Sequence, residues 1–251
     1  MQKYVWKLSL LVVFILILAS CTEEFIPSGN SIVEKAIENH GGDLYKNSKI
    51  EFDFRGKHYV ALRNKGRFSY ERIYSDSTGN VKEYKNNMGV FREVNGESVE
   101  LNQELKTRIG NGINSVIYFA SLPYPLNDKA AVKEFIGMAN MKDQPYYVVE
   151  VTFKAEGGGE DFEDRYIYWF HEETFSMDYL AYYFRVNGGG SRFRIMHNKR
   201  MINGITFTDH ENYKSDEIGD NVEDYDTLFN NENIEKVSDI NLENVSVEIL
   251  K

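Results

Sequence analysis

The chain has 251 residues, of which 39 are acidic and 29 are basic, and its formal net charge is −10. This acidic balance disfavours binding to nucleic acids and other polyanions. A single cysteine, Cys21, excludes disulfide bonds within the chain and thiolate metal sites, so the fold must be stabilised by its apolar core.

The N-terminus has the features of a secretory signal. Lys3 and Lys7 precede an apolar run over residues 8–18 that is too short for a permanent membrane span. The run ends in Leu18-Ala19-Ser20-Cys21, which resembles the lipobox of bacterial lipoproteins. The resemblance implies that residues 1–20 are a signal peptide that is removed. It also implies that Cys21 carries a diacylglycerol thioether, which anchors the protein to a membrane.

Residues 21–30 are too polar to bury much apolar surface and are predicted to form a flexible tether. Without residues 1–20 the chain has 27 basic against 39 acidic side chains, a net charge of −12. The acidic pair Glu23 and Glu24 beside the cysteine is similar to the export signals of Bacteroidota surface lipoproteins. Because flexible tethers are commonly acidic as well, an outer-membrane lipoprotein on either the periplasmic or the surface side fits the sequence.

Two helices are predicted. Ser31 and Glu34 form a capping-box pattern at the start of the first, and Gly41-Gly42 ends it. Asn102 is the predicted N-cap of the second, which Pro123 ends. Each helix has one apolar face. These faces comprise Ile32, Val33, Ala36, Ile37 and His40 in the first helix, and Leu105, Ile109, Ile113, Val116, Ile117 and Ala120 in the second.

Between and after the helices the hydrophobic period changes to two, which predicts antiparallel strands. Aromatic residues alternate with polar ones at Phe52 and Phe54 and again over residues 68–74, and Asn95-Gly96 is typical of a type I′ hairpin turn. Further strands are predicted over residues 81–85, 89–94, 97–101, 135–139, 146–154, 165–171, 176–186, 192–197 and 205–213.

The segment from Lys214 is acidic and is predicted to be a loose tail, with a last edge strand over residues 241–250. Residues 31–251 are therefore expected to form a single β-rich domain with an acidic C-terminal tail. Because helices do not alternate with strands, a Rossmann fold and a (β/α)₈ barrel are excluded.

The layout of helix, meander, helix and second meander resembles the LolA-like and LolB-like lipoprotein carriers. That resemblance implies a mainly β (α+β) fold, a half-open antiparallel β-barrel with helices packed on or inside it, and an interior that holds acyl chains. A more specific resemblance rests on the segments 157–169, 178–182 and 188–194. They are similar to an uncharacterised family of Bacteroidota lipoproteins, a domain of unknown function with no established activity.

The second meander carries aromatic residues on both faces, as in Tyr166 and Tyr168 against Trp169. One face can meet the helices, and the other must line a cavity, meet a partner or be covered by the chain itself. A filled barrel and an open ligand cavity both remain possible on this pattern. The predicted ligand-binding residues are Phe52, Phe54, Phe68, Tyr70, Tyr166, Tyr168, Tyr182, Phe184, Leu122 and Leu126.

Two loops have alternative interpretations. In the first, Leu122, Tyr124 and Leu126 alternate with prolines, so they either plug one end of the barrel or form a movable finger that touches a membrane. The second is a glycine-rich loop whose carboxylates are expected to face two arginines, either as a cation or headgroup site or as a solvated hairpin. The carboxylates are Glu160, Asp161, Glu163 and Asp164, and the arginines are Arg192 and Arg194.

No catalytic constellation, cofactor motif or metal-ligand spacing is present, and the five histidines are scattered. We therefore expect a protein that is not an enzyme and needs no cofactor or metal. The first functional hypothesis is a membrane-anchored module of the cell envelope that binds a hydrophobic ligand, such as a lipid or acyl chain. The alternative is a structural or interaction lipoprotein with a filled core and an envelope protein as its partner.

Overall fold

The computed structural model describes residues 27–154, 156, 164–184 and 189–251. Two seven-stranded sheets make up most of it, and every strand pairs antiparallel with its neighbours. The first sheet has the order β14 (Glu243–Ile249), β1 (Ser48–Phe54), β2 (Lys57–Asn64), β3 (Arg67–Asp76), β4 (Gly79–Asn86), β5 (Gly89–Val94) and β6 (Glu97–Ser98). The second has the order β13 (Glu235–Ile240), β12 (Ile205–Lys214), β11 (Gly190–Ile202), β10 (Met177–Phe184), β9 (Arg165–His171), β8 (Gln144–Phe153) and β7 (Ala131–Met141).

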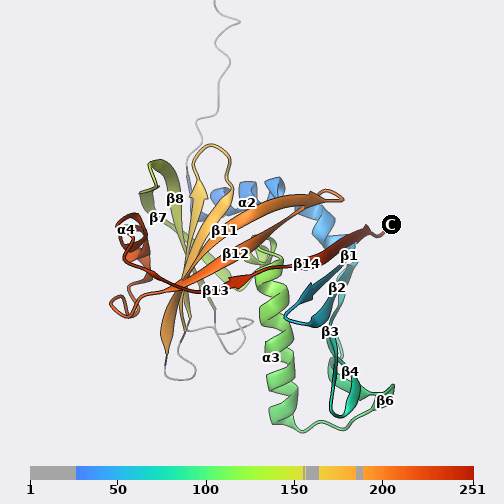
Figure 1. Ribbon diagram of the computed structural model, residues 1–251. Coiled ribbons are helices and arrows are strands. Elements are labelled where there is room, and N and C mark those ends of the chain that lie inside the picture. Colours follow the sequence, from blue (N-terminus) through green and yellow to red (C-terminus); the bar gives the residue numbers. More distant parts are fainter. Residues whose placement is uncertain (1–26, 155, 157–163, 185–188) are drawn as a thin grey trace, which may run out of the picture.

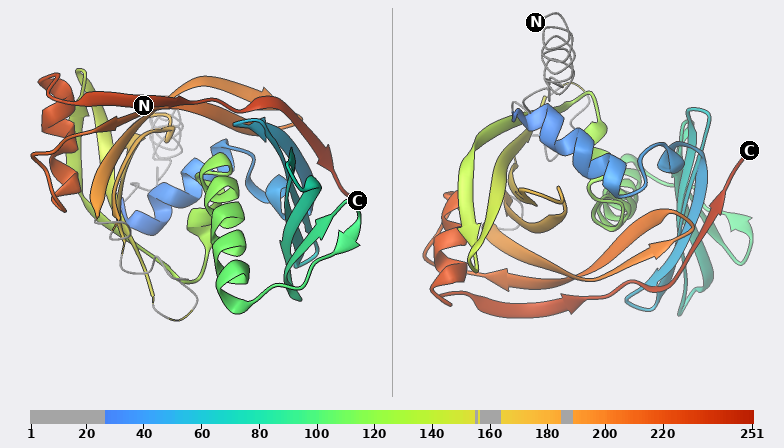
Figure 2. Two further views of the ribbon diagram at one scale, coloured as in Figure 1. Left: turned by 60° about the horizontal axis from the view of Figure 1, so that its bottom comes forward. Right: turned by 90° about the horizontal axis from the view of Figure 1, so that it is seen from above.

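The helices and helical turns fill the space between the sheets or cover their outside. They are α2 (Gly29–Asn39), η1 (Gly42–Asn47), α3 (Gln103–Ala120), η2 (Tyr124–Asn127), η4 (Val222–Asp224) and α4 (Tyr225–Asn230). Figure 1 shows the two sheets on opposite sides of α3, and in Figure 2 the sheets curve around α2 and α3. Among the described strands the sheets stay two separate ladders, so the predicted mainly β, half-open arrangement with internal helices is confirmed.

The start of α2 differs from the prediction. Its N-cap is Ser28, whose hydroxyl accepts from the amide of Ser31, and Ser31 in turn bonds back to the amide of Ser28. Ser31 therefore completes the capping box instead of opening it, and Glu34 plays no part. The apolar face was predicted correctly, because Ile32 and Ala36 are fully buried against the second sheet.

The predicted start of α3 is confirmed, since the Asn102 side chain accepts from the amide of Leu105. Ile109, Ile113 and Ile117, one turn apart, pack on the first sheet in a core that includes Tyr45 and Ile50. Side chains on the other side of the same helix, among them Tyr118 and Phe119, pack toward the second sheet. The helix thus separates two apolar cores.

The chain after Lys214 is not the loose tail that its acidic composition predicted. Ile218, Val222 and Tyr225 are buried on the outer face of the second sheet, where they cover Trp169 and Phe193. In Figure 1, α4 lies outside that sheet, on the side away from α3.

The last two strands belong to different sheets. Strand β13 extends the second sheet. Strand β14 pairs with β1 at the edge of the first sheet, which confirms the edge strand predicted over residues 241–250.

The outer face of the second meander, which the aromatic pattern left without a partner, is therefore covered by the chain's own C-terminal segment. The inner face, with Tyr168 and Phe170, is covered by α2 and by the connection after α3. No helix among the described residues is long and apolar enough to cross a membrane.

Candidate functional site

A cavity of about 290 Å³ lies between α3 and the strands β12 and β13. One wall is apolar and consists of Phe54, Val116, Phe119, Ala120, Ile240 and Leu242. The opposite wall is polar and consists of Arg194, Thr208, His210 and Asn212, and the exposed residues Arg55 and Ser115 stand at its opening.

The polar wall follows from the pleat of β12. Thr208, His210 and Asn212 are two residues apart, so their side chains leave the strand on the same face. Asn212 is the direct cross-strand partner of Arg194 on β11, which places the guanidinium beside this row. On the far side of the cavity, Arg55 occupies the left-handed position of the tight turn between β1 and β2, with a φ of 50°.

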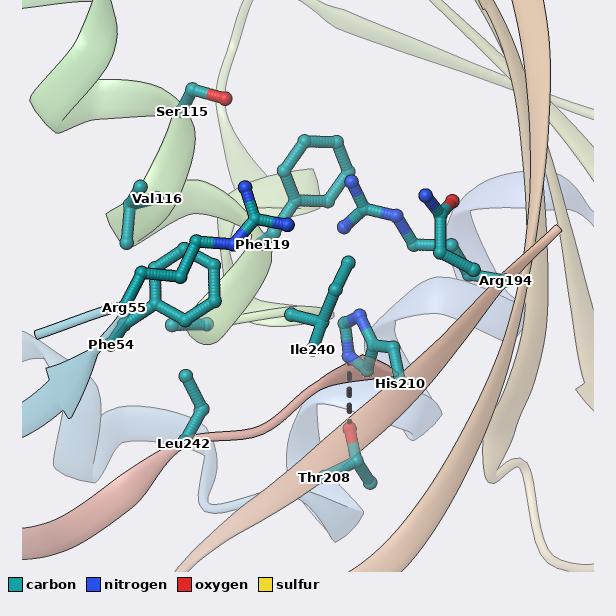
Figure 3. A pocket seen from close by; sticks show the side chains of 12 residues that line it. Phe54, Arg55, Ser115, Val116, Phe119, Arg194, Thr208, His210, Ile240 and Leu242 are labelled. Atoms are coloured by element: carbon teal, nitrogen blue, oxygen red, sulfur yellow. Dashed lines mark hydrogen bonds between the residues drawn. The ribbon is translucent and has the colours of Figure 1, made fainter. Parts of the chain in front are cut away.

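Arg194 is a buried cation, with 8% of its surface exposed. Its Nη2 donates to the hydroxyl of Tyr182 at 2.9 Å, and its guanidinium lies 3.8 Å from the centre of the Phe119 ring. The Nε atom has no hydrogen-bond partner. Figure 3 shows the guanidinium groups of Arg194 and Arg55 both pointing into the cavity.

His210 is held neutral at physiological pH. Burial, with a smaller contribution from the charge of Arg194, lowers the pKa of His210 to about 3. Its Nε2 lies 3.3 Å from the hydroxyl of Thr208, a contact drawn in Figure 3, while Nδ1 has no partner. A neutral imidazole can carry its proton on Nδ1 and accept from Thr208 at Nε2, which leaves Nδ1 as a buried donor.

Asn212 adds a third unsatisfied group. Its Nδ2 donates to Ser238 at 3.5 Å, and its Oδ1 has no partner. Buried polar atoms in folded proteins nearly always have a hydrogen-bond partner. Within the described ranges, Arg194, His210 and Asn212 each leave one such atom unsatisfied in the wall of the same small cavity, closed off from solvent. The arrangement can hold a polar group at one wall while an apolar group contacts the other.

A second, larger space of about 980 Å³ lies on the other side of α3. Arg63, Tyr70, Tyr124 and Tyr166 are among the residues that line it, together with lysine, asparagine and aspartate side chains. Arg63 is buried, donates to the hydroxyls of Tyr70 and Ser121, and lies over the rings of Tyr70 and Tyr124. This space is a polar groove with aromatic walls.

The predicted ligand residues are divided between the two spaces and the core. Phe54 lines the small cavity, and Tyr70 and Tyr166 line the groove. Tyr182 lines neither, but its hydroxyl accepts from Arg194. Phe68 contacts the ring of Tyr70, and Phe184 contacts Arg192, at the partly exposed ends of their strands.

Four of the predicted residues lie in the packed core and line neither space. Phe52 stacks on Tyr59, and the hydroxyl of Tyr168 lies 3.0 Å from that of Tyr118. Leu122 and Leu126 are buried in the core between α2 and the second sheet. Their burial agrees with the interpretation of the proline-rich connection as a plug and contradicts the exposed finger.

The acidic glycine-rich loop and the anchor lie mostly outside the described residues, which include neither Cys21 nor residues 157–163. Of the two arginines expected to face that loop, Arg192 lies over the ring of Phe184, while Arg194 points into the small cavity. Over the described ranges, no group of three or more histidine, cysteine or acidic residues is placed to hold a metal ion.

Sequence reasoning missed Thr208, His210 and Asn212. The signal was present, because residues 208–212 are polar at every position, so both faces of a central strand must be polar. Such a strand is unusual in a core, and one of its polar faces needs a hydrated or ligand-filled space.

These observations define the class of protein: it has two curved antiparallel sheets around an internal helix, and an amphipathic cavity lies beside that helix. The chain belongs to the DUF6503 family, a family of unknown function, whose model matches residues 7–243. The predicted resemblance to an uncharacterised family is confirmed to that extent, and the Bacteroidota origin stays a prediction. A search of curated proteins gave no significant match.

The solved structures that match the chain share little sequence with it. A LolA-superfamily protein from Nitrosomonas europaea is 10% identical with a TM-score of 0.49, over 90% of this chain and 94% of that one. A DUF1329 family protein from Desulfovibrio piger is 10% identical with a TM-score of 0.47, over 88% and 93%. An outer membrane lipoprotein-sorting protein domain from Vibrio parahaemolyticus is 9% identical with a TM-score of 0.47, over 88% and 92%.

Proposed function

We propose that this protein is a membrane-anchored lipoprotein of the bacterial cell envelope, in the outer membrane, whose small cavity binds an apolar chain ending in a polar group. The cavity carries this proposal, because it sets a wall of four polar residues, one of them the buried cation Arg194, opposite six apolar side chains. A ligand with one polar end and one apolar end satisfies both walls.

The apolar wall favours a hydrocarbon over water as the occupant. Water in a cavity needs two to four polar partners, and the side formed by Val116, Phe119 and Leu242 offers none from its side chains. Removing apolar surface from water contributes about 25 cal/mol per Å² buried, so a chain that covers this wall is held in part by the hydrophobic effect.

The anchor follows from the sequence. Cys21 at the end of a lipobox would fix the cavity close to a membrane surface, where molecules with acyl chains are found. We retain the sequence-based prediction that the protein has no catalytic activity and that an acyl or lipid molecule is its ligand.

The test is a search for bound lipid in the lipid-free chain of residues 22–251, which contains every described residue. Extraction and mass spectrometry of this chain should yield about one acyl-chain compound per protein. Ala120→Phe, which adds a ring at the apolar wall, should release the compound, and Lys106→Phe, an exposed site on the same helix, should retain it. Recovery of no acyl compound from the unsubstituted chain, or equal recovery from Ala120→Phe, would falsify the proposal.

One observation favours the alternative of an interaction lipoprotein. In the described structure β7 is an edge strand of the second sheet, and it exposes Val132, Ile136 and Met138. Exposed edge strands with apolar side chains pair readily with other chains. Crosslinking in cells that returns one stoichiometric envelope protein, lost when Ile136 is replaced with Lys, would support this function.

A further inference from the structure

We infer that the small cavity selects a carboxylate: its ligand is a fatty acid whose head group binds Arg194. The inference rests on the proposed function and adds the chemical class of the ligand. Arg194 is a buried cation that has no counter-charge within the described part of the chain.

Four other partly buried arginines of the described structure have carboxylate partners. Arg72 and Arg92 pair with the buried Glu83, Arg165 pairs with Glu150 and Glu223, and Arg200 pairs with the buried Asp209. Arg194 is at least as buried, yet within the described ranges its only polar partner is the neutral hydroxyl of Tyr182. Its contact with the Phe119 ring offers a weak attraction and no negative charge.

An isolated buried charge is strongly disfavoured, and an arginine cannot lose its proton to escape that cost. A bound anion removes the imbalance. Arg63 also lacks a carboxylate partner among the described residues and has an unsatisfied Nη1, but it donates to two hydroxyls and lies over two tyrosine rings, whereas Arg194 donates to one hydroxyl. The small cavity combines an unpaired guanidinium with additional unsatisfied polar groups.

The guanidinium of Arg194 points into this space. Its planar set of N–H donors matches the two oxygens of a carboxylate. The unsatisfied atoms Nε of Arg194, Nδ1 of His210 and Oδ1 of Asn212 lie behind this surface with almost no accessible area, so they can contact a ligand only if their side chains turn.

The size and charge of the site favour a fatty acid over a phospholipid. One buried guanidinium balances one negative charge, while Arg55 at the opening is exposed and its charge is solvated. At about 290 Å³ the cavity is at the small end of the range for small-molecule pockets, which suits one acyl chain better than two. With its carboxylate at Arg194, the chain would run past Phe119 toward Phe54 and Leu242, which Figure 3 places across the cavity.

The experiment compares decanoic acid with 1-decanol, two chains of equal length that differ in the head group. Each is titrated by calorimetry at pH 7.5 into residues 22–251. Decanoate should bind at least about tenfold more tightly than decanol, because only the carboxylate pairs with the guanidinium. In Arg194→Met this preference should disappear while decanol still binds. Arg194→Lys should keep part of it, and Arg192→Met, with the same loss of charge outside the cavity, should keep all of it.

The outcomes separate the two proposals. If the unsubstituted chain binds neither probe, the proposed function and the inference both fail. If it binds both with equal affinity, the apolar site stands and the carboxylate assignment is wrong. Tighter binding of decyl phosphate than of decanoate would also overturn the assignment. The comparison of probes on the unsubstituted chain decides the question even if an Arg194 variant does not fold.

Discussion

Leu126 shows how one side chain settles the role of a whole connection. It follows Pro125 in a segment whose alternation of leucine and proline fitted either a plug or an exposed finger, and it is fully buried beside α2. Prolines keep such a segment out of a central strand but do not determine which way its side chains turn. The neighbouring Tyr124 stacks on Tyr45, with 4.6 Å between ring centres, so the connection links two cores.

Leu126→Ala should therefore be strongly destabilising. Truncation of a buried leucine removes apolar contacts and leaves a cavity, which typically costs about 2–5 kcal/mol. Urea unfolding of residues 22–251 measures the loss of free energy. Met88→Ala is the matched control, because Met88 is 86% exposed and its truncation should change the free energy by less than about 0.5 kcal/mol. Equal stability of the two variants would restore the finger interpretation.

His210 should make the protein less stable in mild acid. Its pKa is lowered to about 3 in the folded chain, while the unfolded chain has the ordinary value of about 6.5. Between pH 6.5 and pH 3 only the unfolded state takes up the proton. The contribution of neutral His210 to the free energy of unfolding is therefore fully present above pH 6.5 and is lost as the pH falls toward 3. The decline is about 1.4 kcal/mol per pH unit, or about 2 kcal/mol at pH 5.

The measurement is the free energy of unfolding at pH 7.5 and pH 5, for the unsubstituted chain and for His210→Gln. Burial also lowers the pKa of His40, so both proteins should lose stability in acid, but His210→Gln should lose about 2 kcal/mol less. Parallel losses in the two proteins would show that His210 is protonated in the folded state.

At the scale of elements, local signals gave reliable predictions and distant contacts did not. The strand over Arg165–His171 and the cap at Asn102 coincide with the prediction, because alternation and capping are properties of neighbouring residues. A strand was expected at His58 and Tyr59, but its bounds could not be predicted, because Tyr59, Val60 and Ala61 are consecutive buried residues and the centre of β2 has no period of two.

The C-terminal segment was mistaken for a loose tail for a related reason. Its few apolar residues are spread through an acidic sequence, and what covers them lies far back in the chain, at Trp169 and Phe193. The same lack of long-range information left the aromatic meander with one unexplained face. The candidate site was predicted only in part, since Phe54 was named but the unpaired state of Arg194 depends on which strands become neighbours.

Tyr225 tests the structural role of this segment. Its ring stacks on Phe193, and its hydroxyl bonds to the Ser191 side chain and accepts from the amide of Ser215. Tyr225→Phe should cost about 1–3 kcal/mol by leaving those partners unsatisfied, and Tyr225→Ala about 3–5 kcal/mol.

Fluorescence of Trp169 reports the result, because it is the only tryptophan in residues 22–251 and is fully buried. Tyr225→Ala should unfold at lower urea concentration, with the emission of Trp169 shifting to that of a solvated indole. A Tyr225→Ala chain as stable as the unsubstituted one would mean that the segment is dispensable.

At the scale of the whole molecule, the proposed function joins an anchor to a cavity. Cys21→Ser should abolish lipid attachment, because only a thiol can take the diacylglycerol thioether. Cells grown with radioactive palmitate should label the unsubstituted protein and leave the variant unlabelled. Label on the variant would place the lipid at another residue and remove the anchor from the account.

The central claim is that an apolar chain occupies the space between α3 and β12. Anomalous diffraction from crystals of residues 22–251 grown with 10-bromodecanoic acid tests it most directly. We predict a bromine peak near Phe54 and Leu242, with the carboxylate beside the guanidinium of Arg194. A bromine peak elsewhere, or a cavity that contains only water at saturating probe, would contradict the account.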